Sequence, residues 1–273
     1  MRSIGAALLL LALAVPGCSL ISLDGLTGGL AAPEAGADGE GGESLPGYAG
    51  AVLADKPVAY WRFDEPSGNV AKDSSGNGND AQYVGGVTLG APGALAGDSD
   101  TAATFDGVTG FVTAGGSFAF AGLTKFSLEA WVMASSIPGY AGVASKNDAI
   151  GGPPSEGFLV FVSPDDGDFG FQRLSGDNAS SAISTASASA TSFLHVVVTY
   201  DGIDMILYVN GEPQGTQTAS FSIEGAMADF VVGAEAGGTA NYFAGTLDEV
   251  AVYDTALPAE HVQAHYLAGI TPP

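Results

Sequence analysis

Cysteine and basic residues are scarce in this chain of 273 residues, and each shortage excludes a class of protein. Cys18 is the single cysteine, so the chain is not a disulfide-stabilised scaffold. Seven Lys and Arg stand against thirty Asp and Glu, and the formal net charge is −23. Because binding to nucleic acid or to an anionic lipid surface relies on clustered basic side chains, this balance argues against both. Cationic partners and divalent ions remain compatible with the charge.

Long apolar runs are also missing, except in the N-terminal segment MRSIGAALLLLALAV. This segment carries Arg2 before an apolar stretch shorter than the ~20 residues of a membrane span, which is typical of a secretory signal peptide. The last residue of this segment begins the sequence Val15-Pro16-Gly17-Cys18, which resembles the lipobox of bacterial lipoproteins. The resemblance implies a signal peptide over residues 1–17 and lipidation of Cys18, which would anchor the protein in the bacterial cell envelope. Ser19 stands where inner-membrane lipoproteins carry Asp, which favours the outer membrane. An ordinary secretory signal with an incidental cysteine is the alternative.

Aromatic residues are absent from the next segment, residues 18–47, where Gly, Ala, Pro and acidic residues dominate. Such a composition buries too little apolar area to offset the entropy of ordering, so we expect a flexible linker. The composition changes at Tyr48, where aromatic and β-branched residues begin to recur. We therefore expect one folded domain over residues 48–270.

Short apolar runs bounded by Gly, Asp, Asn or Pro fill this domain. In the stretch 126–133, Phe126, Leu128, Ala130 and Val132 alternate with Ser127, Glu129, Trp131 and Met133, which is the period of a β-strand. Asp-Gly at 201–202 and Asn-Gly at 210–211 indicate hairpins, because these residues tolerate positive φ. The pattern predicts an all-β sandwich of antiparallel sheets. One helix is expected near the C-terminus, over residues 257–269, with Pro258 at its start and Gly269 at its end.

Several segments together resemble the laminin-G-like domain of the concanavalin A-like lectin/glucanase superfamily. They are AYWRFDEPSG (59–68), DSSGNGNDA (73–81), TFDGVTGFV (104–112), FSLEAWV (126–132), LHVVVTYDG (194–202), LYVNGE (207–212) and GTLDEVAVYDTALPAEHVQAHY (245–266). The resemblance spans almost all of residues 48–270. It implies a jelly-roll sandwich of two curved antiparallel sheets with a short C-terminal helix.

Paired catalytic acids are missing from the sequence. Glucan-cleaving members of this superfamily carry Glu-x-Asp-x-x-Glu or Glu-x-Asp-x-Glu on one strand, so that the carboxylates share a face. Neither pattern occurs here, and the adjacent pairs Asp64-Glu65 and Asp248-Glu249 point their members to opposite faces of a strand. We expect a protein that is not an enzyme, with a glycan-active hydrolase as the alternative. His261 and His265 share a helix face, but a third zinc ligand is lacking.

The segment KDSSGNGNDA (72–81) offers oxygen ligands of the kind that Ca²⁺ prefers. Its candidate ligands are Asp73, Asn77 and Asn79. The resemblance implies a calcium ion at a loop-rich edge of the sandwich, and pairing of the first and last strands would bring Asp64 and Asp248 toward it. A tight turn in which Asp73 or Asn77 binds its own backbone is the alternative.

A glycan-binding face needs exposed aromatic rings beside polar groups. Tyr140, Tyr242 and Phe243, followed by Phe169 and Tyr83, lie near predicted loops and are the candidates. The sequence thus predicts a membrane-tethered module that binds a carbohydrate or an extracellular protein outside the cytoplasm, with a calcium ion. A purely structural envelope or adhesion component is a further alternative.

Overall fold

The computed structural model describes residues 47–148 and 155–272. The predicted signal peptide, the lipidation site at Cys18 and nearly all of the predicted linker lie outside these residues and stay predictions. None of the described helices has the length and apolar character needed to cross a membrane.

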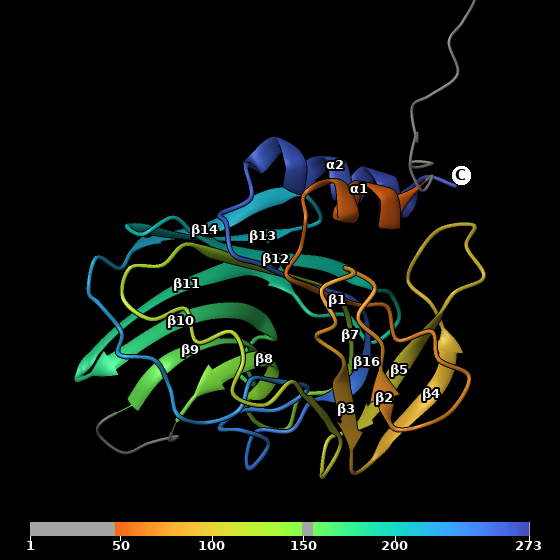
Figure 1. The fold of residues 1–273 in the computed structure, drawn as a ribbon, viewed down its shortest axis with the longest axis horizontal. Coiled ribbons are helices and arrows are strands. Elements are labelled where there is room, and N and C mark those ends of the chain that lie inside the picture. Colours follow the sequence, from red (N-terminus) through yellow and green to blue (C-terminus); the bar gives the residue numbers. More distant parts are fainter. Residues whose placement is uncertain (1–46, 149–154, 273) are drawn as a thin grey trace, which may run out of the picture. The chain divides into compact units, whose positions relative to one another are not determined.

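Two antiparallel sheets form a sandwich, which confirms the predicted jelly-roll class (Figure 1). Sheet A has the order β14-β13-β12-β7-β16-β5-β4, with β1 paired to β16. Its strands are β1 (Ala59–Trp61), β4 (Val87–Pro92), β5 (Thr101–Asp106), β7 (Phe126–Ser136), β12 (Leu194–Tyr200), β13 (Asp204–Val209), β14 (Glu212–Thr218) and β16 (Ala244–Tyr253). Sheet B has the order β11-β10-β9-β8-β15-β6-β3-β2. Its strands are β2 (Val70–Ala71), β3 (Ala81–Val84), β6 (Phe111–Thr113), β8 (Ala141–Asn147), β9 (Ser155–Val162), β10 (Asp168–Gly176), β11 (Asn178–Ser187) and β15 (Val231–Val232).

The main core lies between the sheets and follows the alternation of side chains along each strand. On β7, Phe126, Leu128, Ala130 and Val132 all join the inter-sheet core, as the sequence pattern predicted. The opposite face of β7 is also buried, because helices cover it. Trp131 on that face is 2% exposed and belongs to a second apolar cluster.

The predicted Asn-Gly hairpin is confirmed. Asn210 and Gly211 join β13 to β14 with φ angles of 53° and 79°, so both residues occupy the left-handed region that this pair tolerates. The Ser-rich segment that follows β10 forms β11, the edge strand of sheet B.

Both described helices, α1 (Tyr48–Ala54) and α2 (Ala259–Ile270), lie over the outer face of sheet A (Figure 1). The sequence pattern predicts α2 but gives no signal for α1. Gly269 lies one residue before the last residue of α2, so the predicted helix end agrees with the observed one to within one residue. A Cβ atom there would come within 2.3 Å of the Trp131 ring, so glycine allows the helix to approach sheet A closely.

A buried polar network fastens these helices to sheet A. Glu129 of β7 accepts hydrogen bonds from Tyr48 of α1 at 2.7 Å and from Tyr253 of β16 at 2.6 Å. His195 Nε2 lies 2.7 Å and His265 Nδ1 3.1 Å from the same carboxylate. Burial raises the pKa of Glu129, but the charge of His265 and these hydrogen bonds outweigh it and hold the pKa well below its usual value. The two histidines considered as zinc ligands therefore contact carboxylates of the fold. His265 contacts Glu129, and His261 Nδ1 lies 2.8 Å from Asp55.

Candidate functional site

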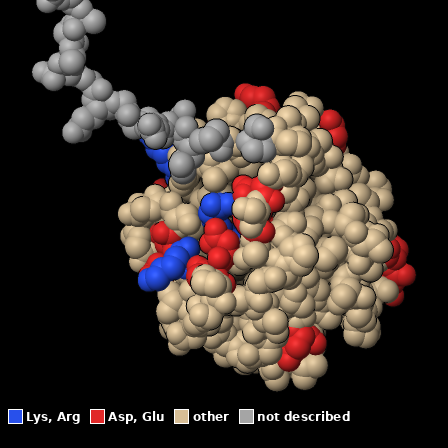
Figure 2. Space-filling view, turned by 90° about the vertical axis from the view of Figure 1, so that its right-hand side faces the viewer, with Lys and Arg blue, Asp and Glu red and all other residues tan. Residues whose placement is uncertain are grey.

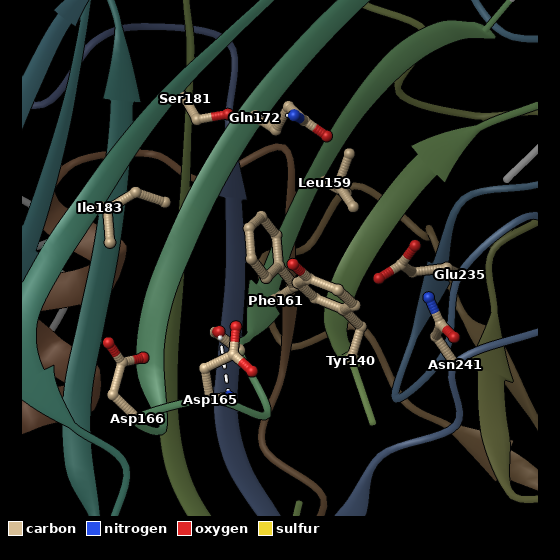
Figure 3. Close-up of a pocket in the computed structure, with 11 residues that line it drawn as sticks. Tyr140, Leu159, Phe161, Asp165, Asp166, Gln172, Ser181, Ile183, Glu235 and Asn241 are labelled. Carbon is tan, nitrogen blue, oxygen red and sulfur yellow. Dashed lines mark hydrogen bonds between the residues drawn. The ribbon is translucent and has the colours of Figure 1, made fainter. Parts of the chain in front are cut away.

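A groove of about 560 Å³ lies on the outer face of sheet B, over β9, β10 and β11 (Figure 3). The strand alternation creates it, because the residues that face outward are neighbours of core residues along the same strands. Phe171 and Ala182 point into the core, whereas Gln172 and Ile183 point into the groove. The groove is lined by Tyr140, Leu159, Phe161, Ser163, Asp165, Asp166, Gln172, Ser181, Ile183, Glu235 and Asn241.

An aromatic pair forms the central part of this groove. The rings of Tyr140 and Phe161 meet edge to face with centroids 5.5 Å apart. Gly170 pairs with Phe161 across β9 and β10, and a Cβ atom at Gly170 would come within 2.1 Å of the Phe161 ring. The missing side chain therefore lets the Phe161 ring lie over the neighbouring strand. Tyr140 stays 51% exposed, so part of its ring is available to a ligand.

Polar groups surround the aromatic pair on several sides. Figure 3 shows Asp165 and Asp166 toward one end, Gln172 and Ser181 toward the other, and Glu235 with Asn241 at the side of Tyr140. Gln172 donates a hydrogen bond to the Ser181 hydroxyl at 3.0 Å. An apolar floor with polar groups around it is the composition of a small-molecule or saccharide site.

Glu235 is the unusual carboxyl group of the groove. It is 3% exposed, and burial raises its pKa to about 7, although a hydrogen bond with Asn241 opposes part of the rise. A carboxyl group with this pKa is protonated in an appreciable fraction of molecules near neutral pH, and it can then donate a hydrogen bond.

The structure distributes the predicted aromatic residues differently. Tyr140 lines the groove. Tyr242 packs against Phe111 beside the groove residue Asn241, and its hydroxyl donates to the Gly238 carbonyl at 2.6 Å. The prediction for Phe243 is wrong: its backbone N–H binds the Gly233 carbonyl at 2.9 Å, and its ring enters the core with 0% exposure.

The two further aromatic candidates also lie away from the groove. Phe169 is fully buried in the core. Tyr83 is partly buried and packs against the margin of this core. Neither ring lines the groove.

The 72–81 segment forms the turn that was the alternative to a calcium loop. The carboxylate of Asp73 accepts backbone N–H bonds from Ser75 at 2.9 Å and Asn79 at 2.8 Å, and a third from Tyr60 of β1 at 3.0 Å. Burial raises the pKa of Asp73, but these bonds outweigh it and lower the pKa. The Asp73 oxygens therefore already serve backbone donors.

The side-chain amides of this segment are also used within the fold. Asn77 donates to the Pro57 carbonyl at 3.0 Å and Asn79 to the Val58 carbonyl at 2.7 Å. These bonds fasten the segment to the entrance of β1. The predicted ligand set of Asp73, Asn77, Asn79, Asp64 and Asp248 is not brought together, because Asp64 and Asp248 belong to a different group of acids.

That group, here called the acidic cluster, consists of Asp64, Asp98, Asp100, Asp248 and Glu249 around Arg62. The predicted pairing of the first and last strands is confirmed, since β1 pairs with β16, and it places Arg62 beside Glu249. Arg62 Nε donates to Glu249 Oε1 at 3.0 Å. The other Arg62 nitrogens lie 3.6 Å from Asp64, 3.9 Å from Asp98 and 3.7 Å from Asp100. Figure 2, which looks onto the side of β2 to β5, shows acidic side chains gathered closely with basic ones.

Two members of the acidic cluster are fully buried. Asp248 and Glu249 are 0% exposed on β16, and burial raises the pKa of both. The Asp248 carboxylate accepts backbone N–H bonds from Ala94 at 2.8 Å and Glu249 at 2.9 Å, and Tyr60 donates its hydroxyl to Glu249. Glu249 also has a φ of 52°, an uncommon backbone conformation that turns both acids of the adjacent pair into one region. Arg62, Asp98 and Asp100 were not among the predicted site residues, and the two acids at 98 and 100 are the local signal that points to this segment.

Three solved structures illustrate the kinship of the fold. Domain 4 of AbnA, an extracellular arabinanase from Geobacillus stearothermophilus, in complex with arabinotriose, is 19% identical with a TM-score of 0.57, over 77% of this chain and 98% of that one. The Trypanosoma rangeli sialidase in complex with 2,3-difluorosialic acid is 20% identical with a TM-score of 0.57, over 78% of this chain and 33% of that one. The binding domain of Paraclostridial Mosquitocidal Protein 1 is 16% identical with a TM-score of 0.58, over 78% of this chain and 52% of that one.

The chain therefore spans about half of the toxin domain and about a third of the sialidase. At these identities the likeness shows the fold alone. A search of curated proteins found no match. The sequence model of the concanavalin A-like lectin/glucanases superfamily matches residues 99–263, more than half of the chain, and the protein belongs to that superfamily.

Proposed function

We propose that this protein is a carbohydrate-binding module, tethered to the cell envelope through a lipidated Cys18, that holds a saccharide in the groove on sheet B. The tether rests on the N-terminal sequence and is tested by mass spectrometry of the membrane fraction. Cleavage before Cys18 and a diacylglyceryl group on that residue support it, and an unmodified Cys18 contradicts it.

The observation that carries the binding proposal is the exposed Tyr140 ring, held against Phe161 in a groove with polar groups around it. Sugar rings present C–H faces that pack on aromatic rings and hydroxyls that need hydrogen-bond partners. Gln172, Ser181 and the carboxyl groups of Asp165 and Asp166 supply such partners. The fold kinship is compatible with this role, since the related arabinanase domain was solved with arabinotriose and the related sialidase with a sialic acid derivative.

A glycan microarray probed with the full chain tests the proposal. The array carries arabinan and sialylated oligosaccharides among its printed glycans. We expect the protein to bind a restricted set of them. Tyr140→Ala removes the exposed ring, so we expect the affinity for the best ligand to fall by about tenfold or more, which corresponds to ~1.4 kcal/mol.

Ile183 and Ile203 provide a matched pair for calorimetric titration with the best array ligand. Both are exposed isoleucines, at 44% and 58%, but only Ile183 lines the groove. We expect Ile183→Ala to weaken binding severalfold and Ile203→Ala to leave it unchanged. Equal effects of the two substitutions, or an array without any bound glycan, would contradict binding in the groove.

A glycan hydrolase is the second candidate, and Glu235 is the observation that favours it. A carboxyl group whose pKa is raised to about 7, in a groove that also holds the carboxyl groups of Asp165 and Asp166, has the property of a general acid. Reducing-end assays on a polysaccharide panel distinguish the candidates. Under the binding proposal the chain releases no product; turnover that Glu235→Gln abolishes would support the hydrolase instead.

A further inference from the structure

The groove on sheet B is lined by acidic side chains and by no basic ones among the described residues. Its acids are Asp165, Asp166 and Glu235, and neither Lys, Arg nor His lines it. Asp165 and Asp166 are exposed in the turn between β9 and β10, whereas Glu235 is 3% exposed. The formal charge of the groove is therefore negative, as is that of the whole chain.

The basic residues on the strands around the groove point into the interior of the protein. Lys146 of β8 is 1% exposed, and its Nζ donates to the Ala228 carbonyl at 2.8 Å. Arg173 of β10 is fully buried and donates to the Ala219 carbonyl at 2.9 Å. It follows Gln172, which lines the groove, so the alternation of side chains places Arg173 on the other face of the strand. Both cations thus bind the fold and are turned away from a ligand in the groove.

Glu235 is a buried carboxyl group that no basic side chain of the described residues compensates. Burial raises its pKa to about 7, and only a hydrogen bond with Asn241 opposes this rise. Figure 3 shows its carboxyl group pointing toward Tyr140. Because a buried carboxylate is costly unless a cation pairs with it, an ammonium group on a ligand beside Tyr140 would supply what the fold does not.

Tyr140 is the second feature of the groove that attracts a cation. Its ring is 51% exposed and meets the Phe161 ring edge to face. The face of an aromatic ring attracts a cation within about 6 Å of its centroid, and the same face packs against the C–H groups of a sugar. An exposed ring with carboxyl groups on two sides therefore suits a sugar that carries an ammonium group. A sialylated or uronic-acid saccharide would instead add negative charge to a groove without a basic partner.

We propose that the groove selects saccharides with a free amino group, such as oligomers of glucosamine. This inference rests on the proposed saccharide binding and specifies the charge of the ligand. The sugar ring packs on Tyr140, and its ammonium group donates to the carboxyl groups on either side. Acetylation of the amine removes the charge and leaves a single N–H donor, so it weakens binding. Anionic saccharides are excluded from the groove by charge.

Calorimetric titration of the full chain with a glucosamine trimer and with its fully N-acetylated form tests the proposal, because the two ligands differ only at nitrogen. The titrations are run at about pH 6, where the sugar amines are protonated. We expect the trimer with free amines to bind about tenfold more tightly at low salt. This preference should shrink in about 0.5 M NaCl, since salt screens the attraction between charges.

Asp165 and Asp177 provide a matched pair of variants. Both are exposed aspartates in the turns at the two ends of β10, but only Asp165 lines the groove. We expect Asp165→Asn to reduce the preference for free amines severalfold and Asp177→Asn to keep it. Tyr140→Ala should weaken the binding of both trimers, whereas a nonspecific attraction of amines to the acidic chain would survive this substitution.

Equal affinities for the two trimers, tighter binding of a sialylated glycan, or equal effects of Asp165→Asn and Asp177→Asn would each overturn the preference for amino sugars. Binding of free amines that survives Tyr140→Ala would overturn it as well. If a neutral or anionic glycan then still depends on Tyr140 and Ile183, the proposed saccharide site stands and the charge preference alone fails. Absence of binding to every glycan would contradict both.

Discussion

At the scale of a single residue, Glu235 makes the stability of the protein depend on pH. Burial in the groove raises its pKa to about 7, while an unfolded glutamate titrates near 4.5. The folded state therefore holds a proton between these two values that the unfolded state has released. The stabilising contribution of protonated Glu235 is fully present below about pH 4.5 and is lost as the pH rises through 7.

We predict that Glu235→Gln removes this pH dependence. The shift corresponds to about 3 kcal/mol, because one pKa unit equals ~1.4 kcal/mol. The difference in the free energy of unfolding between variant and wild type should grow in favour of the variant from pH 4.5 to 8. Urea denaturation at several pH values measures it. Parallel pH profiles for the two proteins would show that the groove does not raise this pKa.

Single residues were the hardest features to predict from the sequence. Tyr140 could be found because it lies beside Gly139 in a turn-rich segment and its ring stays exposed. Phe243 has equally turn-like neighbours, yet its backbone pairs with Gly233 and turns the ring inward. Asp73 has the oxygen atoms of a calcium ligand, but backbone N–H groups occupy them. A local pattern cannot show which way a ring points or what a carboxylate faces, because residues distant in the sequence decide both.

At the scale of an element, α1 depends on the polar network around Glu129. The helix has only seven residues, and its Gly47 N-cap contributes no side-chain bond, so packing must supply most of its stability. Tyr48 is 3% exposed and donates to Glu129 at 2.7 Å, which joins the helix to β7.

We predict that Tyr48→Phe lowers the free energy of unfolding by about 1.5–3 kcal/mol, the range for a hydrogen bond to a charged group. Tyr242→Phe is the matched control, because its hydroxyl donates to the uncharged Gly238 carbonyl and should cost about 1 kcal/mol. Urea denaturation of the full chain measures both. Equal losses would mean that the Glu129 charge does not strengthen the bond to α1.

Elements with a strong periodic pattern were predictable, and short ones were not. The alternation in β7 and the Asn-Gly hairpin appear directly in the sequence, since side-chain period and turn chemistry are local properties. The helix α1 has no side-chain bond at its N-cap, and its sequence YAGAVLA contains no polar residue that would mark an exposed face, so it gives no such signal. Gly269 lies near the helix end, as predicted, but its close packing against Trp131 depends on the tertiary fold and could not be predicted.

At the scale of the whole molecule, the two sheets have different outer faces. Both described helices cover sheet A, where Trp131 and Tyr253 are buried beneath them. The groove lies on sheet B, where Tyr140 and Ile183 remain exposed. The resemblance in the sequence was sufficient to predict the sandwich. It could not predict which sheet carries the groove, because that depends on where the helices pack.

The acidic cluster is likewise a product of the whole fold. Pairing of the first and last strands was expected, and it brings Arg62 to Glu249. Asp100 joins them from the segment before β5, where the two acids at 98 and 100 are a local signal that does not show what they face. The sequence therefore indicated acids at this end of the sandwich, while their convergence on one point required the three-dimensional structure.

A crystal structure of the chain with the best array-selected oligosaccharide tests the central claim most directly. We predict a sugar ring packed against Tyr140, with its hydroxyls bound by Gln172, Ser181 or the carboxyl groups of the groove. An oligosaccharide bound at another face of the sandwich, with an empty groove on sheet B, would contradict the account.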